Sequence, residues 1–347
     1  MPNFNKIKDK KILILSVAMD SWTEDEKISS LLSYDLLKKQ IPEKNFALQI
    51  EEFSTSVQLE KFLKNHNPEY YVVFNWCEEL DGVENNFEIA PKLLDKYNYI
   101  YSGNGAESLE LTSDKVKVKK LLVDNGISTP KYLIVNKIRD VYTWDIFPCI
   151  VKPAYEHCSY GVTKESVVDT PEALAIRSQQ LFEKFHQSLL VEEFINGTEF
   201  FVSVWGYEKP EVLPFMSLDY SFTNDYHEKI FSFGAKWDRN SREFKKSEYL
   251  EPGDMEPALL RRIKREVIDC YEVTKCEGYA RMDLRIKNNI PYILDVNANP
   301  DMTVESDFVL ATEKKGYNYG ETILKLCEIA FINSQIPANL LENKQEE

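Results

Sequence analysis

Two stretches in the last third of the chain decide the fold. Residues 280–284 read Ala-Arg-Met-Asp-Leu, and residues 292–300 read Tyr-Ile-Leu-Asp-Val-Asn-Ala-Asn-Pro. Both are typical of strands, in which alternate side chains face the same side of the sheet. The Arg and Asp of the first stretch therefore share one face, as do the Asp and the first Asn of the second. The intervening residues are apolar and indicate a buried opposite face: Met282, Leu284, Leu294 and Val296.

The polar face of this predicted hairpin brings together Arg281, Asp283, Asp295 and Asn297. Two carboxylates and a carboxamide are hard oxygen ligands that suit Mg²⁺, which completes its octahedron with water and substrate phosphates. An arginine beside such an ion can stabilise a transferring phosphoryl group or a developing oxyanion. The alternative is a half-exposed hairpin with a solvated charged face, and the hairpin alone leaves both interpretations open.

The pairing of residues across the hairpin decides whether the two acids share one face. Asp283 and Asp295 are an even number of positions apart, so in a regular hairpin they oppose each other only across a turn with an odd number of residues. We predict a three-residue loop, Asn-Asn-Ile, at residues 288–290. A two-residue Asn-Asn turn would place the two acids on opposite faces.

Composition limits the function classes. A chain of 347 residues with 43% hydrophobic content can form two or three folded units. A formal net charge of −15 argues against a nucleic-acid partner, which needs a basic surface. The apolar run at residues 12–18 is too short to span a membrane, and no signal peptide is evident, so we expect a soluble, cytoplasmic protein with no membrane partner. The six cysteines lack CxxC spacing, which favours free thiols: Cys77, Cys149, Cys158, Cys270, Cys276 and Cys327.

The first third of the chain alternates between predicted strands and helices. A buried strand at residues 11–18 precedes a helical apolar pattern at Ile28, Leu31, Leu32, Leu36 and Leu37. Further strands are predicted at 46–50, 70–74 and 99–102, with helices near 57–66 and 87–97. This alternation predicts an open parallel sheet wrapped by helices, with ligands at the carboxyl ends of the strands. No GxGxxG follows the first strand, which disfavours a dinucleotide-binding domain.

A second unit is predicted to begin with a helix at 113–126. It continues with strands at 132–135, 149–152 and 189–193, a helix from Thr170 and a strand at 200–205. The polar stretch 219–253 has little periodicity and indicates a mobile loop of the kind that forms lids. Helices near 259–271 and 321–331 flank the hairpin. We divide the chain into units at 1–112, 113–206 and 207–347.

Several groups along the second unit could hold a nucleotide. Lys152 ends an apolar strand, where its ammonium could reach phosphate oxygens, and the loop at 154–161 could offer backbone N–H groups. Lys115 lies in the first turn of a helix, where its charge opposes the helix dipole. The strand–turn–strand at 189–199 could present backbone groups to an adenine edge, and Glu199 could accept a ribose hydroxyl. Each has a plain alternative as a surface lysine or an ordinary turn.

Two acids after the first strand, Glu24 and Glu26, could bind a ligand at the carboxyl end of the sheet. Glu26 also fits a capping box with Thr23, in which the glutamate reaches back to the start of the helix. Both interpretations stay open.

Taken in order, these segments resemble the ATP-grasp enzymes, and most closely the D-alanine–D-alanine ligase branch. The resemblance covers nearly the whole chain. It rests on the following ordered segments: Asp-Gly at 81–82, Tyr-Ser-Gly at 101–103, Thr-Ser-Asp-Lys at 112–115, Val-Lys-Pro at 151–153, the loop at 156–161, residues 192–199, Ala-Lys-Trp at 235–237 and the final hairpin. It implies an α/β ATP-grasp fold, in which an N-terminal open parallel α/β domain precedes two α+β subdomains that clasp ATP.

The resemblance also implies roles for individual residues. Asp283, Asp295 and Asn297 would hold two Mg²⁺ ions, with Mn²⁺ as an alternative, although Asp295 stands where the family usually has Glu. Arg281 would stabilise the oxyanion, and Ser306 would hold a substrate carboxylate. The ATP phosphates would contact Lys115, Lys152 and Lys236. The hinge for adenine would be formed by Glu192, Glu193, Phe194 and Ile195, with Glu199 at the ribose. Glu24 or Glu26 resembles the glutamate that binds the ammonium of the first substrate.

Three departures from the family pattern bear on the substrate. The lid serine in the loop after Glu156 is Cys158 here, with Ser159 next to it, and both are candidates for the catalytic lid contact. The lid tyrosine is Trp237, which has no oxygen to donate or accept a proton. The glycine after the metal hairpin is Asp301, which adds a carboxylate beside the expected place of a carboxylate substrate. These changes argue against D-alanyl-D-alanine as the product.

The sequence thus predicts an ATP-dependent ligase that joins a carboxylate, such as an amino acid, to an amine through an acyl phosphate. An alternative within enzymes is an amino-acid conjugating ligase with an unusual acceptor. An alternative of another class is an ATP-binding regulatory protein that keeps the fold without catalysis. A zinc enzyme or a Cys158 nucleophile is disfavoured, since no partner pattern is readable. The resemblance implies a homodimer.

Overall fold

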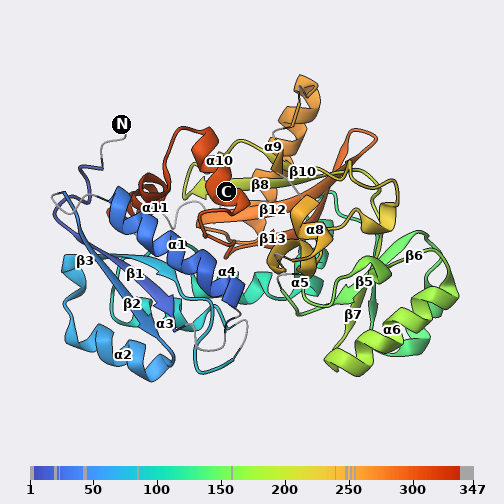
Figure 1. Cartoon of the computed structure of the whole chain (residues 1–347), viewed down its shortest axis with the longest axis horizontal. Helices are drawn as coiled ribbons and strands as arrows, with labels where there is room; N and C mark the ends of the chain where they lie inside the picture. The colour runs from blue at the N-terminus through green and yellow to red at the C-terminus, as the bar shows by residue number, and fades with distance from the viewer. Residues whose placement is uncertain are drawn as a thin grey trace.

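The computed structural model describes residues 4–18, 22, 24–41, 45–83, 86–157, 159–238, 240–246, 249–250, 252–253 and 255–336. It is a mixed α/β protein with one parallel and two antiparallel sheets (Figure 1). This arrangement agrees with the ATP-grasp fold class predicted from the sequence. Within the described residues, no helix is long and apolar enough to cross a bilayer.

The N-terminal unit is built on a three-stranded parallel sheet in the order β2-β1-β3. Its elements are β1 (Lys11–Val17), α1 (Glu24–Gln40), β2 (Ala47–Phe53), α2 (Ser56–Asn65), β3 (Tyr71–Trp76), α3 (Ile89–Lys96) and α4 (Ala106–Thr112). The central strand β1 is buried on both faces because helices cover both sides of the sheet. The strand predicted at 99–102 is reduced to a single parallel bridge between Tyr101 and Val73.

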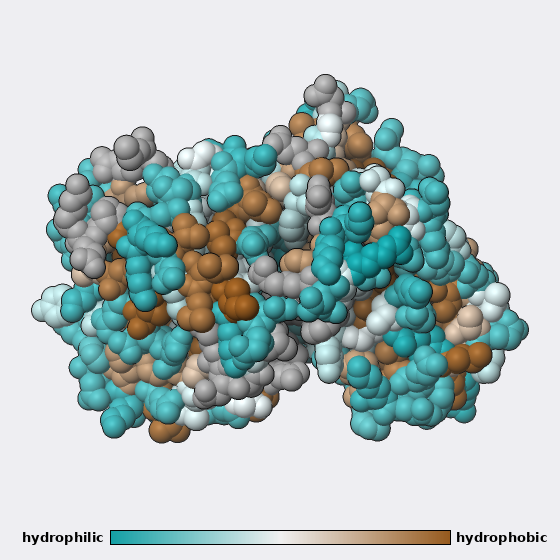
Figure 2. Space-filling model, in the orientation of Figure 1, coloured by the Kyte–Doolittle hydropathy of each residue, from teal (hydrophilic) through white to brown (hydrophobic). Residues whose placement is uncertain are grey.

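The burial of side chains on helix α1 differs from what the spacing of its apolar residues indicates. Leu37 is fully buried, but Ile28, Leu31 and Leu32 are about half exposed. In Figure 2, hydrophobic residues gather over the region of this helix. The buried stripe of α1 instead includes Tyr34, whose hydroxyl donates to Ser16 Oγ at 2.6 Å.

The middle unit contains a four-stranded antiparallel sheet in the order β4-β7-β5-β6. Its elements are α5 (Lys115–Asp124), β4 (Tyr132–Val135), β5 (Cys149–Pro153), β6 (Val167–Val168), α6 (Pro171–Phe185) and β7 (Leu189–Glu193). Asp114 and Thr170 cap the two helices by accepting from backbone N–H groups. A separate apolar cluster between α6 and the sheet gives this unit a hydrophobic core of its own.

The large antiparallel sheet has its main strands in the order β11-β10-β8-β12-β13, and β9 pairs with β8. Its strands are β8 (Thr198–Gly206), β9 (Glu211–Val212), β10 (Met216–Leu218), β11 (Tyr249–Leu250), β12 (Gly278–Lys287) and β13 (Ile290–Asn297). The associated helices are α7 (Phe233–Trp237), α8 (Arg242–Lys246), α9 (Pro257–Val273), α10 (Asp307–Lys314) and α11 (Tyr319–Ser334). The strand just before the predicted boundary at 206 thus pairs inside this sheet, and the division into units at 112 and 206 stays a prediction.

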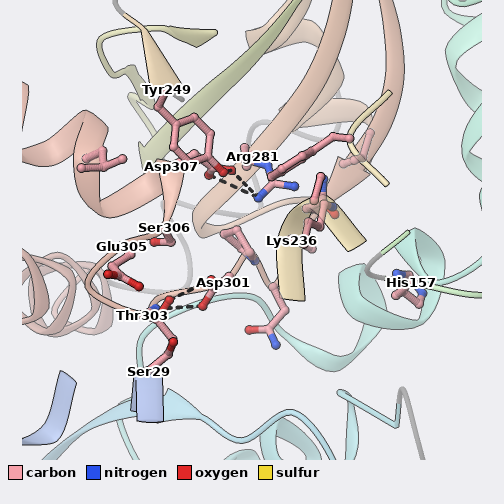
Figure 3. Close-up of a pocket in the computed structure, with 18 of the residues that line it drawn as sticks. Ser29, His157, Lys236, Tyr249, Arg281, Asp301, Thr303, Glu305, Ser306 and Asp307 are labelled. Carbon is pink, nitrogen blue, oxygen red and sulfur yellow. Dashed lines mark hydrogen bonds and ion pairs between the residues drawn. The ribbon is translucent and has the colours of Figure 1, made fainter. Parts of the chain in front are cut away.

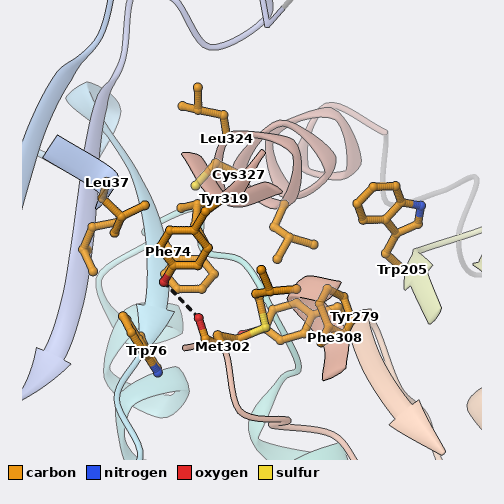
Figure 4. Close-up of a cluster of buried hydrophobic side chains, with 14 of the residues drawn as sticks. Leu37, Phe74, Trp76, Trp205, Tyr279, Met302, Phe308, Tyr319, Leu324 and Cys327 are labelled. Carbon is orange, nitrogen blue, oxygen red and sulfur yellow. Dashed lines mark hydrogen bonds between the residues drawn. The ribbon is translucent and has the colours of Figure 1, made fainter. Parts of the chain in front are cut away.

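The two faces of the large sheet pack against different helices. Met282 and Leu284 belong to an apolar cluster with α9 and α5. On the other side, Tyr279 packs with Phe308 of α10 and Phe74 of β3 (Figure 4). This second cluster includes residues of α11 and of the N-terminal sheet, so the last helix joins the two ends of the chain.

The hairpin of β12 and β13 corrects the predicted turn. Lys287 pairs with Ile290, so the turn is the two-residue Asn288-Asn289, and both asparagines have positive φ, of 53° and 59°. Such turns match the twist of the strands. Regular pairing would then put Leu294 opposite Asp283 and turn Asp295 to the buried face. A β-bulge takes up Leu294, and Asp283 pairs with Asp295 after all.

The bulge also corrects the prediction for Leu294. Two consecutive residues of β13, Leu294 and Asp295, both line the same cavity. The buried position expected for Leu294 is filled by Ile293, which is fully buried. The acids therefore share a face, as predicted, but for a different reason: the extra residue lies in the strand and not in the turn.

Candidate active site

Two cavities adjoin between the large sheet and the other two units. The larger has a volume of about 420 Å³ and is lined by Arg281, Asp301 and Ser306 among others. The smaller has a volume of about 120 Å³ and is lined by Lys115, Lys152 and other residues of the predicted ATP set. Among the described residues, four line both cavities: His157, Phe231, Lys236 and Asn297. Residues predicted for ATP thus line a cavity that adjoins the one lined by Asp301 and Ser306, two of the residues predicted for the substrates.

A buried ion triad supports the smaller cavity. Glu192 lies between Lys119 Nζ, at 2.5 Å, and Lys152 Nζ, at 2.7 Å. Burial alone would raise the pKa of Glu192, but the two lysines outweigh burial and hold this pKa below its usual value. Burial lowers the pKa of Lys119, whereas Glu192 outweighs burial at Lys152 and raises its pKa. Glu192 therefore fixes Lys152 in the cavity wall.

The carboxylates of the hairpin lie beside these cations. Asp295 Oδ2 is 3.6 Å from Lys115 Nζ, which also donates to the carbonyl of Glu156 at 2.5 Å. Burial opposes ionisation of Asp295, but Lys115 and Lys152 outweigh it, so its pKa lies far below the usual value. Asn297 Nδ2 donates to Asp283 Oδ2 at 3.2 Å. The predicted set is therefore assembled at one place.

This donor set fits a divalent metal ion. Two carboxylates on paired strands and one amide oxygen are hard ligands, and Mg²⁺ commonly needs only one or two carboxylates because phosphates and water complete its shell. The described residues contain no cluster of three or more His, Cys, Asp or Glu that could hold a metal. A metal here would therefore depend on nucleotide phosphates as well as on Asp283, Asp295 and Asn297.

The hinge predicted for adenine lines the smaller cavity. Phe194 and Ile195 are buried, and the carbonyl of Ile195 accepts from Arg285 Nη1 at 3.1 Å. The carboxylate of Glu193 lies 3.5 Å from Lys287 Nζ. At Glu199, Oε2 accepts from Arg285 Nη2 at 2.7 Å and from the hydroxyl of Tyr220 at 3.0 Å. Arg285, which sequence reasoning missed, thus holds both the hinge and the ribose candidate.

The loop at 156–161 contacts the segment that was predicted to be a lid. Ser159 Oγ donates to the carbonyl of Phe231 at 2.7 Å. Lys236 follows on the short helix α7 and lies 4.8 Å from the centre of the Phe231 ring. Cys158 lies outside the described residues, and the side chain of Trp237 does too. The described residues of the stretch 219–253, predicted as a loop, include the short elements α7, α8 and β11.

Arg281 is the centre of a buried ion network in the larger cavity. Its Nε and Nη2 donate to Asp283 at 2.6 and 3.0 Å. Its Nη1 donates to both oxygens of Asp307, at 3.2 and 2.9 Å (Figure 3). The hydroxyl of Tyr249 also donates to Asp307, at 3.3 Å. Burial opposes the charge on Arg281, but the two aspartates outweigh it and raise its pKa well above the usual value.

Asp301 and Ser306, which were predicted to contact the substrates, line the larger cavity, and their role stays a prediction. Asp301 accepts from the backbone N–H and from the hydroxyl of Thr303, both at 2.8 Å, and burial raises its pKa. Ser306 caps α10 by accepting from the N–H of Val309. Figure 3 shows both residues on the loop that leads from the hairpin into this helix.

Glu24, the described one of the two acids predicted on α1, does not line either cavity. Glu24 is largely exposed, pairs with Lys27 at 3.2 Å and is not among the described residues that line either cavity. The side chain of Glu26 lies outside the described part of the chain, as does Thr23. The same helix instead brings Asp25 and Ser29 to the larger cavity. The described residues of α1 that face the cavity are therefore Asp25 and Ser29.

Four further site residues were missed from the sequence. Lys119 and Asp307 are buried charged residues on helices. The available sequence signal for each was a charged residue next to apolar neighbours. Arg285 lies two positions beyond Asp283 on the same strand, and alternation could have placed it on the polar face. For His157 no signal was available; burial and the nearby Lys115 lower its pKa to about 4, so it is neutral at pH 7.

Comparisons with known proteins agree with this geometry. A family model described as "D-ala D-ala ligase C-terminus" matches residues 122–328. The D-alanine–D-alanine ligase of Hydrogenovibrio crunogenus is 30% identical over 243 residues, which cover 68% of this chain and 71% of that protein. An uncharacterized protein, y4sG of Sinorhizobium fredii, is 28% identical over 260 residues, covering 75% and 74% of the two chains.

Solved structures show the same fold over most of the chain. D-alanine–D-alanine ligase from Bacillus anthracis complexed with ATP superposes with a TM-score of 0.69 and 20% identity, covering 94% of this chain and 98% of that one. The VanG D-Ala:D-Ser ligase from Enterococcus faecalis gives a TM-score of 0.70 and 18% identity, covering 93% and 99%.

The sheet arrangement and the structural neighbours define an ATP-grasp fold, in which two adjoining cavities share part of their lining. The family match covers more than half of the chain, so the chain belongs to the D-alanine–D-alanine ligase family. This is a family of ATP-dependent enzymes that form a C–N bond. The predicted family, fold class and enzyme class are confirmed.

Proposed function

We propose that this protein joins a carboxylate to an amine by way of an acyl phosphate, and that one cavity binds ATP while the other binds the two substrates. The smaller cavity takes ATP, with Lys115, Lys152 and Lys236 at the phosphates. The hinge at 192–195 takes adenine and Glu199 the ribose. The larger cavity takes the carboxylate and the amine. The comparisons give no support to the alternative of an ATP-binding regulator without catalysis.

One observation carries this proposal: the two cavities share Lys236 and Asn297 in their common wall. A γ-phosphate held at the end of the smaller cavity would face a carboxylate held in the larger one. Holding two reactants in line in this way is a major source of rate enhancement. The shared wall is therefore where phosphoryl transfer would occur.

The chemistry has two balanced steps. A carboxylate oxygen attacks the γ-phosphorus of ATP, and the β–γ bridging bond breaks, giving an acyl phosphate and ADP. The nitrogen of a neutral amine then attacks the acyl carbon, its proton is lost, and inorganic phosphate leaves. Arg281 still has N–H groups to donate to the tetrahedral oxyanion, since a guanidinium has five. Lys115, Lys152 and Lys236 would offset phosphate charge in the first step.

Divalent metal is expected with the nucleotide, as throughout this family. We propose two Mg²⁺ ions, with Mn²⁺ as a substitute, held by Asp283, Asp295, Asn297 and the ATP phosphates. When bound, these ions would neutralise charge on the transferring phosphoryl group. A homodimer, implied by the family resemblance, remains a prediction.

The test is an ATP-dependent release of ADP and phosphate over a panel of carboxylates and amines, followed by mass spectrometry of the product. We expect turnover that requires magnesium and gives a product heavier than the carboxylate by the amine minus water. In Asp295→Asn, the magnesium concentration needed for ATP binding should rise at least about tenfold. Tenfold is the lower end of the loss of metal affinity that follows from replacing residues around metal sites. Tight ATP binding without turnover on any pair would contradict the proposal.

A further inference from the structure

Arg285 is a buried cation in the wall of the smaller cavity. It lies on β12, on the same side of the strand as Asp283, and it is only 3% exposed. Burial opposes the charge on Arg285, but Glu199 outweighs burial and raises the pKa of the guanidinium. A cation at this depth needs partners inside the protein, and those partners are the groups proposed to bind the nucleotide.

Glu199 is the first of the groups that Arg285 holds. Nε and Nη2 of Arg285 donate to Glu199 Oε2 at 3.2 and 2.7 Å, and the hydroxyl of Tyr220 donates to the same oxygen at 3.0 Å. Within the part of the chain that the structure describes, the hydrogen bonds of the Glu199 side chain end on Oε2. The carboxylate is thus fixed through one oxygen, and Oε1 is the oxygen left for a ribose hydroxyl.

Two backbone carbonyls are the other groups. Nη1 of Arg285 donates to the carbonyl of Ile195 at 3.1 Å, and Nη2 donates to the carbonyl of Lys229. Ile195 belongs to the hinge proposed for adenine. In the same hinge, the ring of Phe194 has its centre 4.8 Å from Cζ of Arg285. Arg285 therefore contacts the groups proposed for the base and the group proposed for the ribose.

Lys229 connects Arg285 to a third part of the cavity wall. It belongs to the segment 226–231, whose Ile230 packs against the hinge and lines the smaller cavity. A few residues further along the chain, the short helix α7 carries Lys236, the lysine proposed to contact the ATP phosphates. The position of this lysine thus depends on a segment that Arg285 holds by its backbone.

A purely structural role explains only part of these contacts. A buried arginine and a buried glutamate compensate each other's charge whether or not a nucleotide binds, and such a pair supports folding alone. The contacts to Ile195 and Lys229 go further, because they join the hinge and the 226–231 segment to Glu199 through one side chain. A planar guanidinium can hold three groups in fixed relative positions, which the compact ammonium of a lysine does not do.

We infer that Arg285 is a positioning residue for the nucleotide: it orients Glu199 toward the ribose and holds the segment that leads to Lys236 at the phosphates. Recognition of the ribose is thereby coupled to the placement of a cation at the other end of ATP. The inference rests on the proposed function, in which the smaller cavity takes ATP, and it adds a residue that determines nucleotide specificity.

The first experiment measures nucleotide binding to the intact protein by calorimetry in the presence of magnesium, so it needs neither the carboxylate nor the amine. ATP is compared with 2′-deoxy-ATP and 3′-deoxy-ATP. We expect the wild-type protein to bind at least one deoxynucleotide at least about tenfold more weakly than ATP, the effect of losing a hydrogen bond to a charged group. In Arg285→Lys this preference should fall to about twofold or less, because the ammonium cannot replace the fork.

Arg262→Lys is the matched control. Arg262 also donates to a glutamate, Glu266, and to a backbone carbonyl, that of Asn289, but it is not among the described residues that line either cavity. The control variant should keep the full preference for ATP. An unaltered preference in Arg285→Lys, or an equal loss in both variants, would overturn the inference. Equal binding of the three nucleotides by the wild-type protein would overturn it too, while the ligase function stands.

The second experiment tests the coupling to Lys236. Lys236→Met should weaken ATP binding at least about tenfold in the wild-type background, since it removes a charged contact to phosphate. In the Arg285→Lys background the same change should weaken ATP binding by about threefold or less. Binding of adenosine, which has no phosphates, should not respond to Lys236→Met. Losses that multiply as independent effects would overturn the coupling.

If Arg285→Lys does not fold, a crystal structure of the wild-type protein with magnesium and a non-hydrolysable ATP analogue decides the inference. We expect Glu199 Oε1 within hydrogen-bond distance of a ribose hydroxyl, with Arg285 still bonded to Oε2 and to the carbonyl of Lys229. Release of Arg285 from either group would overturn the inference. ATP binding without turnover on any substrate pair would overturn the ligase function alone, and absence of ATP binding would overturn both.

Discussion

Asp283 and Asp295 lie directly opposite each other on β12 and β13, although only two residues form the turn between the strands. The bulge at Leu294 makes this pairing compatible with the turn. Without it, Asp295 would pair with Met282, which belongs to the buried core. The position of a possible metal ligand is thus set by one extra residue in a strand.

The bulge leads to a prediction about deletion. Removing Leu294 shortens β13 by one residue, and regular pairing across the same turn then still puts Asp295 opposite Asp283. We expect the deletion variant to fold and to keep magnesium-dependent ATP binding within about tenfold, as measured by calorimetry. Leu294→Gly, which keeps the extra residue, separates the loss of the cavity-lining side chain from any change of register. Complete loss of ATP binding only in the deletion variant would contradict this register argument.

Glu192 leads to a prediction about stability. Glu192→Gln leaves Lys119 and Lys152 buried together without their shared carboxylate. Removing one partner of a buried ion pair costs roughly 3–5 kcal/mol of the free energy of unfolding, which urea denaturation can measure. Glu193→Gln is the control, because that side chain is partly exposed and its contact to Lys287 is long, at 3.5 Å. It should cost about 1 kcal/mol or less. Similar losses in the two variants would argue against the triad.

Arg281 leads to a prediction that separates folding from turnover. Arg281→Ala removes both an oxyanion donor and the cation of the buried ion network. Asp283 and Asp307 would be left buried without their cation, so this variant should lose stability as well. Arg281→Lys keeps the charge and loses the fork. We expect it to fold with turnover reduced about 100-fold, the effect of losing one oxyanion donor. Thermal unfolding and steady-state kinetics measure the two effects, and near-normal turnover would count against the oxyanion role.

His227 leads to a prediction about pH. Its ring bonds to Asp169 at 2.8 Å and to Asp225 at 2.7 Å, and these contacts outweigh burial and raise its pKa. Because the folded pKa lies above the unfolded value, the contribution of this contact is fully present below about pH 6.5 and is lost as the pH rises through the folded pKa. The contact ties the segment around Tyr226–Glu228 to the middle unit. NMR titration should show a midpoint above 6.5 that falls in Asp169→Asn. An unchanged midpoint would contradict the assignment.

The sequence by itself determined the parts of this protein that depend on short-range physics. Strand alternation put Arg281 with Asp283 and Asp295 with Asn297, and capping residues such as Asp114 and Thr170 marked where helices begin. Alternating strands and helices predicted the parallel sheet. These features depend on neighbours in the chain, so they can be read from spacing.

Only the tertiary structure decided which charges meet. Asp307 is 26 positions from Arg281, and Lys119 reaches Glu192 from another element. The side of α1 that faces the cavity, with Asp25 in place of Glu24, depends on how that helix packs against the rest of the protein. The bulge at Leu294 likewise depends on which face of β13 is buried. Burial and packing between distant segments set these contacts, and spacing along the chain does not encode them.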